Sequence, residues 1–203
     1  MREIGLFPLG IVLLPGEQVP LHIFEPRYRQ LIGECLEEGA PFGLVFADES
    51  GLRKVGTEAE IVEVLERFDD GRLNIVVEGG ERFRLVELTE GRVFATAEIV
   101  TVSDGEERPT QAEVERCLAA YRRVAAAAGE EAEEVDAVAG SVAYQIAAHI
   151  EFGAHEKQTL LELTSERERV VRLAGLLERA AEAVRRGREI RERASTNGRV
   201  EPL

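Results

Sequence analysis

The residues with the most reactive side chains are few and widely spaced. The chain has three histidines and two cysteines, and His22 is the single histidine of the first half. No Cys, Ser or Asp stands at a spacing from His22 that is typical of a nucleophile and its base. We therefore expect His22 to be a structural histidine, and the sequence predicts no catalytic residue.

Metal chemistry is not indicated either. Cys35 and Cys117 are far apart, and neither has a Cys or His neighbour at the spacing of zinc ligands. Both lie among apolar residues with helical spacing, which predicts small buried side chains. His149 and His155 flank a glycine without further recognisable ligands, and a place at a helix end suits them better. The sequence predicts no metal, disulfide framework or cofactor.

The sequence also lacks the residues that usually carry out nucleotide hydrolysis and proteolysis. The sequence contains no G-x-x-x-x-G-K-[ST] loop to hold phosphates. Its two lysines, Lys54 and Lys157, have no serine in a context that would indicate a Ser–Lys proteolytic pair. We therefore expect a protein that is not an enzyme.

The charge limits the classes of partner. A net charge of −14 over 203 residues repels phosphate backbones and anionic lipid. The arginines near the C-terminus alternate with glutamates, which is typical of a solvated helix face. No apolar run approaches the ~18 residues of a membrane span. We expect a cytoplasmic protein that binds no membrane, with nucleic acid disfavoured.

The first hundred residues show mostly the two-residue periodicity of strands. Pro26 and Gly39 stand where a helix would begin and end, and Asp69-Asp70-Gly71 indicates a hairpin turn. Gly79 and Gly80 are expected to interrupt a strand. The predicted strands are 4–7, 12–14, 19–24, 42–47, 61–68, 73–78, 81–88 and 93–99.

A polar segment, 103–109, separates this part from one with helical periodicity. Thr110 with Glu113, and Ser165 with Glu168, have the spacing of capping boxes. Apolar stripes at 114–128, 135–150 and 170–184, with a short helix from His155 to Leu163, predict a small antiparallel bundle. The predicted parts are a barrel domain at 1–103, a helical domain at 109–195 and a flexible tail at 196–203.

Several motifs together resemble one family, the amino-terminal substrate-binding domain of Lon proteases. The resemblance extends over about residues 4 to 193 and implies a PUA-like pseudo-barrel followed by a helical bundle. The fold class is therefore expected to be α+β. The ATPase and protease parts of Lon are not expected in this sequence. The motifs are Phe7-Pro8-Leu9, Val12-Leu13-Leu14-Pro15-Gly16, Pro20-Leu21-His22-Ile23-Phe24-Glu25-Pro26-Arg27-Tyr28, Phe42-Gly43, Val55-Gly56-Thr57, Gly79 with Arg82-Phe83, Ile146-Ala147-Ala148-His149, Glu156-Lys157-Gln158 and Leu160-Leu161-Glu162.

The residues of these motifs divide into two predicted groups. The prolines and glycines of the motifs, with two other residues, are expected to be structural: Pro8, Pro15, Gly16, Pro20, Glu25, Pro26, Gly79 and Phe83. A partner surface is predicted at Leu21, His22, Phe24, Arg27, Tyr28 and Arg82. An ion pair of Glu25 and Arg27 with Arg82 is expected to join the first helix to the later strands.

The resemblance implies recognition of unfolded or partner protein segments, with presentation to a protease or ATPase on another chain as one option. An exposed strand edge would supply main-chain hydrogen bonds to such a segment, and apolar side chains would supply pockets. Two alternatives remain open. One is a scaffold that docks a single folded partner, and the other is RNA binding through the barrel.

Overall fold

The computed structural model describes residues 1–136 and 141–197. They form two compact units. Met1–Gly105 and Tyr144–Thr164 make the first unit, and the second contains Glu106–Ala143 and the described residues from Ser165 onward. The contacts within the chain thus group the helical segment Tyr144–Thr164 with the strands. That residues 1–103 and 109–195 fold independently as domains stays a prediction. Of the predicted tail, residues 198–203 lie outside the described residues.

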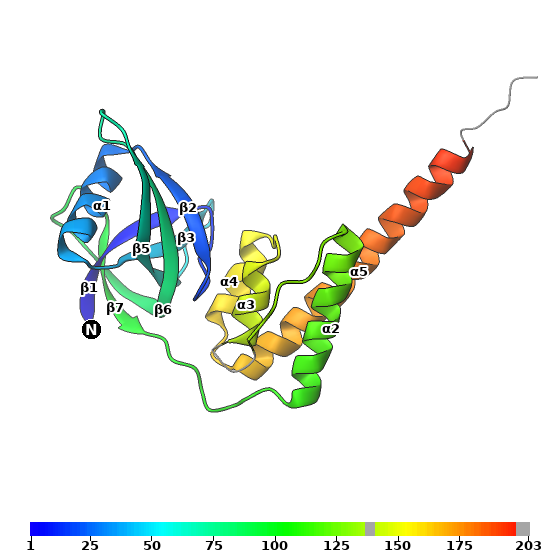
Figure 1. The fold of residues 1–203 in the computed structure, drawn as a ribbon. Helices are drawn as coiled ribbons and strands as arrows, with labels where there is room; N and C mark the ends of the chain where they lie inside the picture. The colour runs from blue at the N-terminus through cyan, green and yellow to red at the C-terminus, as the bar shows by residue number, and fades with distance from the viewer. Residues whose placement is uncertain (137–140, 198–203) are drawn as a thin grey trace, which may run out of the picture. The chain divides into compact units, whose positions relative to one another are not determined.

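The first unit is a barrel whose strands form a closed ring (Figure 1). Around the ring the order is β1, β7, β6, β5 and β3, and β3 pairs back with β1 in parallel, whereas the other ring pairs are antiparallel. The α+β class with a largely antiparallel pseudo-barrel is confirmed. The strands are β1 Arg2–Leu9, β2 Gln18–Ile23, β3 Phe42–Asp48, β4 Gly51–Leu52, β5 Val55–Arg67, β6 Leu73–Thr89 and β7 Thr96–Thr101.

Two apolar clusters form the core of the barrel unit. The smaller one contains Phe83, which is fully buried. The larger one joins the strands to helix α1, Pro26–Glu38. The α1 side chains in that cluster are Tyr28, Leu31, Ile32 and Cys35.

Helix α1 begins and ends as predicted. Pro26 occupies the first turn, where its missing N–H costs nothing, and Glu25 before it is extended. Gly39 adopts φ 63°, a left-handed conformation, and its N–H bonds to the Cys35 carbonyl. The last turn contains no basic residue.

The prediction of a strand at 12–14 is wrong. Val12, Leu13 and Leu14 are buried, but they belong to an irregular loop between β1 and β2. The loop is held by other means, because the Thr57 hydroxyl donates to the Leu13 carbonyl at 2.6 Å. Gly16, at φ 78°, donates its N–H to the Gly79 carbonyl at 2.7 Å.

The predicted interruption at Gly79 and Gly80 is also wrong. β6 runs through both glycines as one strand of 17 residues. A Cβ on Gly79 would collide with the Leu14 carbonyl oxygen. Glycine is needed here so that the β1–β2 loop can approach the strand, not to end the strand.

Two short helices follow in the chain. α3, Val142–Ala148, begins in the second unit and continues into the first from Tyr144, and α4, Ala154–Glu162, belongs to the first unit. Within the described part of the predicted stripe at 135–150, the helix is α3, and the members Val138 and Ala139 lie outside the described residues. α3 begins where the Glu166 carboxylate accepts the Ala143 N–H at 3.1 Å, which satisfies a free amide of its first turn.

The second unit is built on α2, Gln111–Ala128, and α5, Glu166–Asn197, which lie side by side (Figure 1). The capping box of Thr110 and Glu113 is formed as predicted. Arg116 donates from Nε and Nη2 to the two carboxylate oxygens of Glu178, at 2.9 and 2.7 Å. Cys117 is fully buried on α2, and Cys35 is 9% exposed, so both are free, buried thiols as expected.

Candidate functional site

β2 offers one free edge. Its residues 18–23 pair with residues 78–73 of β6, and no described strand pairs with its other side. Just before β2, the Glu17 carbonyl accepts the Gly79 N–H at 2.9 Å, so residues 17, 19, 21 and 23 direct their backbone groups to β6. The backbone groups of 18, 20 and 22 therefore point outward, and Pro20 has no N–H to offer there.

The solvent face of this sheet has a row of side-chain hydrogen bonds. The His22 Nδ1 atom lies 2.6 Å from Oδ1 of Asn74, and the Asn74 amide donates to Glu66 at 3.1 Å. Gln18 donates to Glu78 at 2.7 Å in the same way. His22 is exposed, and Asn74 is its hydrogen-bond partner.

Three aromatic rings lie together where β2 ends and the β5–β6 hairpin turns. Phe24 is 59% exposed, and its ring stacks on that of His22 with centroids 5.8 Å apart. Phe68, at the end of the β5–β6 hairpin, meets His22 edge-on at 6.1 Å. We call Phe24, His22 and Phe68 the aromatic cluster. Its rings are within reach of a chain that lies along β2.

β5 contributes two more exposed apolar residues, through irregularities in its pairing. The register with β6 shifts between Ile61 and Glu63 and again between Val64 and Glu66. Val62 and Leu65 are the extra residues at these bulges and are 47% and 54% exposed. Sequence alternation cannot locate such bulges, because each one changes the face on which the following residues lie.

The predicted surface residues do not all lie together. Leu21 is half-buried, Arg27 is exposed, and Tyr28 is 6% exposed in the core. Arg82 is 5% exposed. Of the residues predicted for a partner surface, Leu21, His22, Phe24 and Arg27 are thus at least partly exposed, whereas Tyr28 and Arg82 are buried.

The predicted ion pair between α1 and the later strands is wrong. Arg27 pairs with Glu25 at 2.8 Å, two positions away on the same segment. Arg82 instead pairs with Asp104 and donates to the carbonyls of Leu161 and Leu163, the latter at 2.6 Å. These carbonyls stand at the end of α4, where a helix favours a cation.

Two further side chains attach α4 to the barrel. Lys157 forms an ion pair with Glu17, which is 7% exposed in the β1–β2 loop. Gln158 donates to the Val55 carbonyl at 3.1 Å. The Glu-Lys-Gln motif was part of the resemblance, but nothing in the sequence identified its partners in the barrel.

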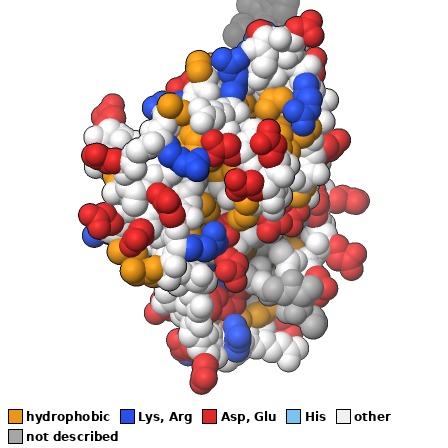
Figure 2. Space-filling view, turned by 90° about the vertical axis from the view of Figure 1, so that its left-hand side faces the viewer, with side chains coloured by type: hydrophobic (Ala, Val, Ile, Leu, Met, Phe, Trp, Pro, Cys, Tyr) orange, Lys and Arg blue, Asp and Glu red, His pale blue; other side chains and the backbone are white. Residues whose placement is uncertain are grey.

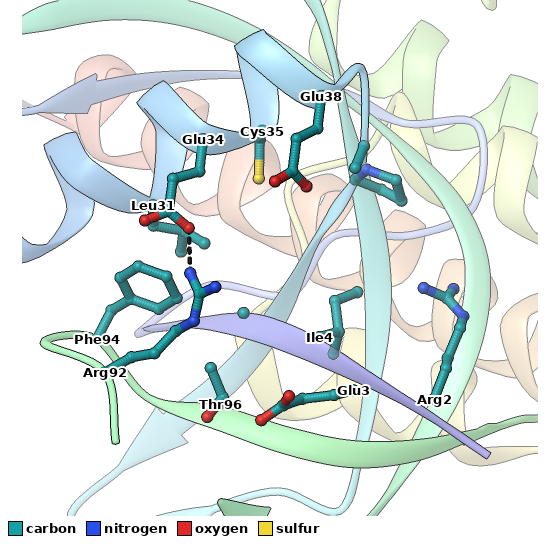
Figure 3. Close-up of a pocket in the computed structure, with 13 residues that line it drawn as sticks. Arg2, Glu3, Ile4, Leu31, Glu34, Cys35, Glu38, Arg92, Phe94 and Thr96 are labelled. Carbon is teal, nitrogen blue, oxygen red and sulfur yellow. Dashed lines mark hydrogen bonds and ion pairs between the residues drawn. The ribbon is translucent and has the colours of Figure 1, made fainter. Parts of the chain in front are cut away.

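A pocket of about 200 Å³ lies beside the C-terminal end of α1 (Figure 3). It is bounded by β1, α1 and the segment before β7. No pattern in the sequence indicates that these three segments lie together. Apolar side chains and charged groups share its lining, whose residues are Arg2, Glu3, Ile4, Gly5, Leu31, Glu34, Cys35, Glu38, Ala40, Pro41, Arg92, Phe94 and Thr96.

Hydrogen bonds and burial set the protonation of two groups in this pocket. The Gln30 amide, with help from Arg92, holds the pKa of Glu34 below its usual value. Burial, aided by the charges of Glu38 and Glu34, raises the pKa of the Cys35 thiol to about 11. Glu34 is therefore charged and Cys35 neutral at neutral pH.

Acidic side chains are spread over the face of the molecule shown in Figure 2, with small groups of hydrophobic side chains between them. In the parts of the chain that the structure describes, no three Cys, His, Asp or Glu side chains are grouped to bind a metal ion. The same parts contain no helix with the length and hydrophobicity of a membrane span.

Fold and motifs together define a barrel with an appended helical part of the type found at the amino terminus of Lon. The model of the ATP-dependent protease La (LON) substrate-binding domain matches residues 3–179, so the chain belongs to that family.

Solved structures show the same fold. The Lon N-terminal domain protein of Xanthomonas campestris superimposes with a TM-score of 0.68 at 23% identity, over 86% of this chain and 98% of that one. The N-terminal domain of Mycobacterium avium complex Lon protease gives a TM-score of 0.62 at 18% identity, over 89% of this chain and 98% of that one.

Curated relatives are much longer than this chain. Lon protease of Parabacteroides distasonis is 29% identical over 89% of this chain and 24% of its own length. Lon protease of Haemophilus influenzae is 26% identical, and the match covers 95% of this chain and 26% of the length of that protein. The chain thus spans about a quarter of the length of these relatives.

Proposed function

We propose that this protein is a polypeptide-binding module that recognises exposed apolar segments of other proteins and performs no catalysis itself. The observation that carries the proposal is the free edge of β2 beside the aromatic cluster. Membership of the substrate-binding family supports it. A protease or ATPase on another chain would act on the bound segment in the cytoplasm.

The edge of β2 suits a short extended segment. Outward N–H groups remain at Gln18 and His22, and outward carbonyls at both of these and at Pro20. Such a row can pair with a few residues of another chain, while Pro20 prevents a long, continuous ladder. The exposed Phe24 ring would cover an apolar side chain of the segment. Because the contact is small, we expect weak binding of many sequences.

The proposal can be tested by fluorescence anisotropy with a labelled, uncharged peptide rich in Phe and Leu. We expect saturable binding in the micromolar range and none to a Ser- and Gly-rich peptide of equal length. Phe24→Ser should weaken binding several-fold. Leu88→Ser is a matched control, because Leu88 is 56% exposed but lies elsewhere, on β6. No binding at high micromolar concentration, or equal losses in both variants, would refute the proposal.

A further inference from the structure

The C-terminal end of α1 is negatively charged, which is unusual for a helix end of this polarity. Helix ends of this polarity favour cations, yet its final residues include Glu34, Glu37 and Glu38 and no basic residue. Arg92 pairs with Glu34 and neutralises it. Among the described residues, Glu38 forms no hydrogen bond or ion pair, although it lines the pocket shown in Figure 3. The arrangement leaves a negative charge without compensation.

The inner wall of this pocket is apolar. Ile4, Leu31 and Phe94 are each at most 5% exposed. Gly5 forms part of the wall, and a Cβ there would collide with Leu31. The Cys35 thiol, 9% exposed, points from α1 towards β1 between Glu34 and Glu38 (Figure 3). An alkyl chain entering the pocket would therefore contact hydrocarbon and a neutral thiol.

Both arginines of the pocket are already paired. Arg2 forms an ion pair with Glu58, whose side chain is 10% exposed, and Arg92 pairs with Glu34. The remaining charges are acidic, since Glu38 has no partner and Glu3 accepts only the Thr89 hydroxyl, at 2.5 Å. The pocket therefore suits a group with an apolar stem and a positive head, whereas an anion would find no free cation.

We propose that this pocket binds a lysine or arginine side chain of the polypeptide whose apolar part lies along β2. The inference rests on the proposed function and adds a preference for a basic residue. A volume of about 200 Å³ is below the ~300–1,000 Å³ of small-molecule sites and is sufficient for one side chain. The stem would pack on Leu31 and Phe94, and the head would lie between Glu3 and Glu38.

The length of α1 sets the spacing of the two anchors. The aromatic cluster is next to the first turn of this 13-residue helix, and the pocket is beside its last turn. At 1.5 Å per residue the helix is roughly 20 Å long. An extended chain rises about 3.3 Å per residue, so the basic residue should stand about six positions from the residue that contacts Phe24.

The test compares three labelled peptides by fluorescence anisotropy. All contain the same Phe- and Leu-rich segment, and the sixth residue from its Phe is Gln, Arg or Glu. We expect the Arg peptide to bind about 2–5-fold more tightly than the Gln peptide, as for a partly exposed ion pair, and the Glu peptide more weakly. Glu38→Gln should abolish the advantage of Arg and leave the Gln peptide unaffected.

Glu37→Gln is the matched control, because it removes an equal charge from the neighbouring exposed position, which does not line the pocket. It should preserve most of the Arg advantage. If no peptide binds, the proposed function fails. If the Gln peptide binds but Arg gives no gain, or if both variants lose the gain equally, only the basic pocket is overturned. Thermal melts of both variants report whether each is folded.

Discussion

Lys157 of α4 forms an ion pair with Glu17 of the β1–β2 loop, 140 positions earlier in the sequence. The Glu17 side chain is 8% exposed and that of Lys157 is 14% exposed. Glu17 also accepts the Leu14 N–H at 3.0 Å. One carboxylate therefore organises the loop and holds a helix against the barrel.

Replacing Lys157 with methionine should destabilise the first unit. The substitution leaves the Glu17 carboxylate buried without its cation, which typically costs about 3–5 kcal/mol. The measurement is urea unfolding followed by circular dichroism. Lys54→Met is the control, because Lys54 is exposed, and it should change stability by no more than about 0.5 kcal/mol. Equal effects of both substitutions would contradict the structural role of the pair.

Adjacent glycines in β6 should respond differently to alanine. A Cβ on Gly79 would collide with the Leu14 carbonyl, so Gly79→Ala should cost about 3 kcal/mol or more. At Gly80 the nearest atom to the new Cβ is 3.5 Å away, an ordinary contact. Gly80→Ala should therefore be nearly neutral in chemical denaturation. A stable Gly79→Ala protein would mean that the loop does not lie against β6.

Loss of Arg82 should loosen α4 selectively. Arg82→Met leaves the Leu161 and Leu163 carbonyls and Asp104 without their shared donor. We expect amide hydrogen exchange in α4 to accelerate by at least tenfold, corresponding to ~1.4 kcal/mol of local stability. Arg84→Met, at an exposed position of the same strand, should leave exchange unchanged. Uniform acceleration throughout the unit would indicate global destabilisation instead.

The buried thiols predict a loss of stability at alkaline pH. Burial raises the pKa of Cys35 to about 11 and that of Cys117 to about 12. An unfolded thiol ionises near pH 8.5, so above that pH the unfolded state releases protons that the folded state retains. Stability from this source is fully present below pH 8.5 and is lost progressively as the pH rises to about 11 for Cys35 and about 12 for Cys117. Unfolding at pH 8 and 10 should show a smaller decline for a Cys35→Ala, Cys117→Ala double variant.

Local signals in the sequence were sufficient for several elements. Pro26 and Gly39 marked α1 correctly, and the Thr110–Glu113 capping box marked the start of α2, because these signals act within one helical turn. The run Val12–Leu14 has the composition of a strand, but a turn and the Glu17 carboxylate satisfy its backbone instead. Composition alone cannot distinguish these two ways of satisfying a buried backbone.

The part of the candidate surface that sequence reasoning proposes lies within one continuous segment. Leu21, His22 and Phe24 were identified from a continuous motif, and these residues are exposed or half-buried on or next to β2. The predicted ion pair of Arg82 with the start of α1 is wrong, because its partner Asp104 follows β7, far from that motif in the sequence. The pocket beside α1 went unpredicted, since its walls come from three separate segments whose pairing the sequence does not encode locally.

The discontinuity of the first unit has a consequence for how the chain is made. β1 pairs with β7, so the ring of strands cannot close until residue 101 has been synthesised. The unit is complete only at residue 164, after roughly 60 further residues. At about 5–20 residues per second the ribosome needs roughly 3–12 s for this stretch. During that interval Glu17 and Arg82 have no helix to bind, and the nascent barrel is exposed to chaperones and proteases in an unfinished form.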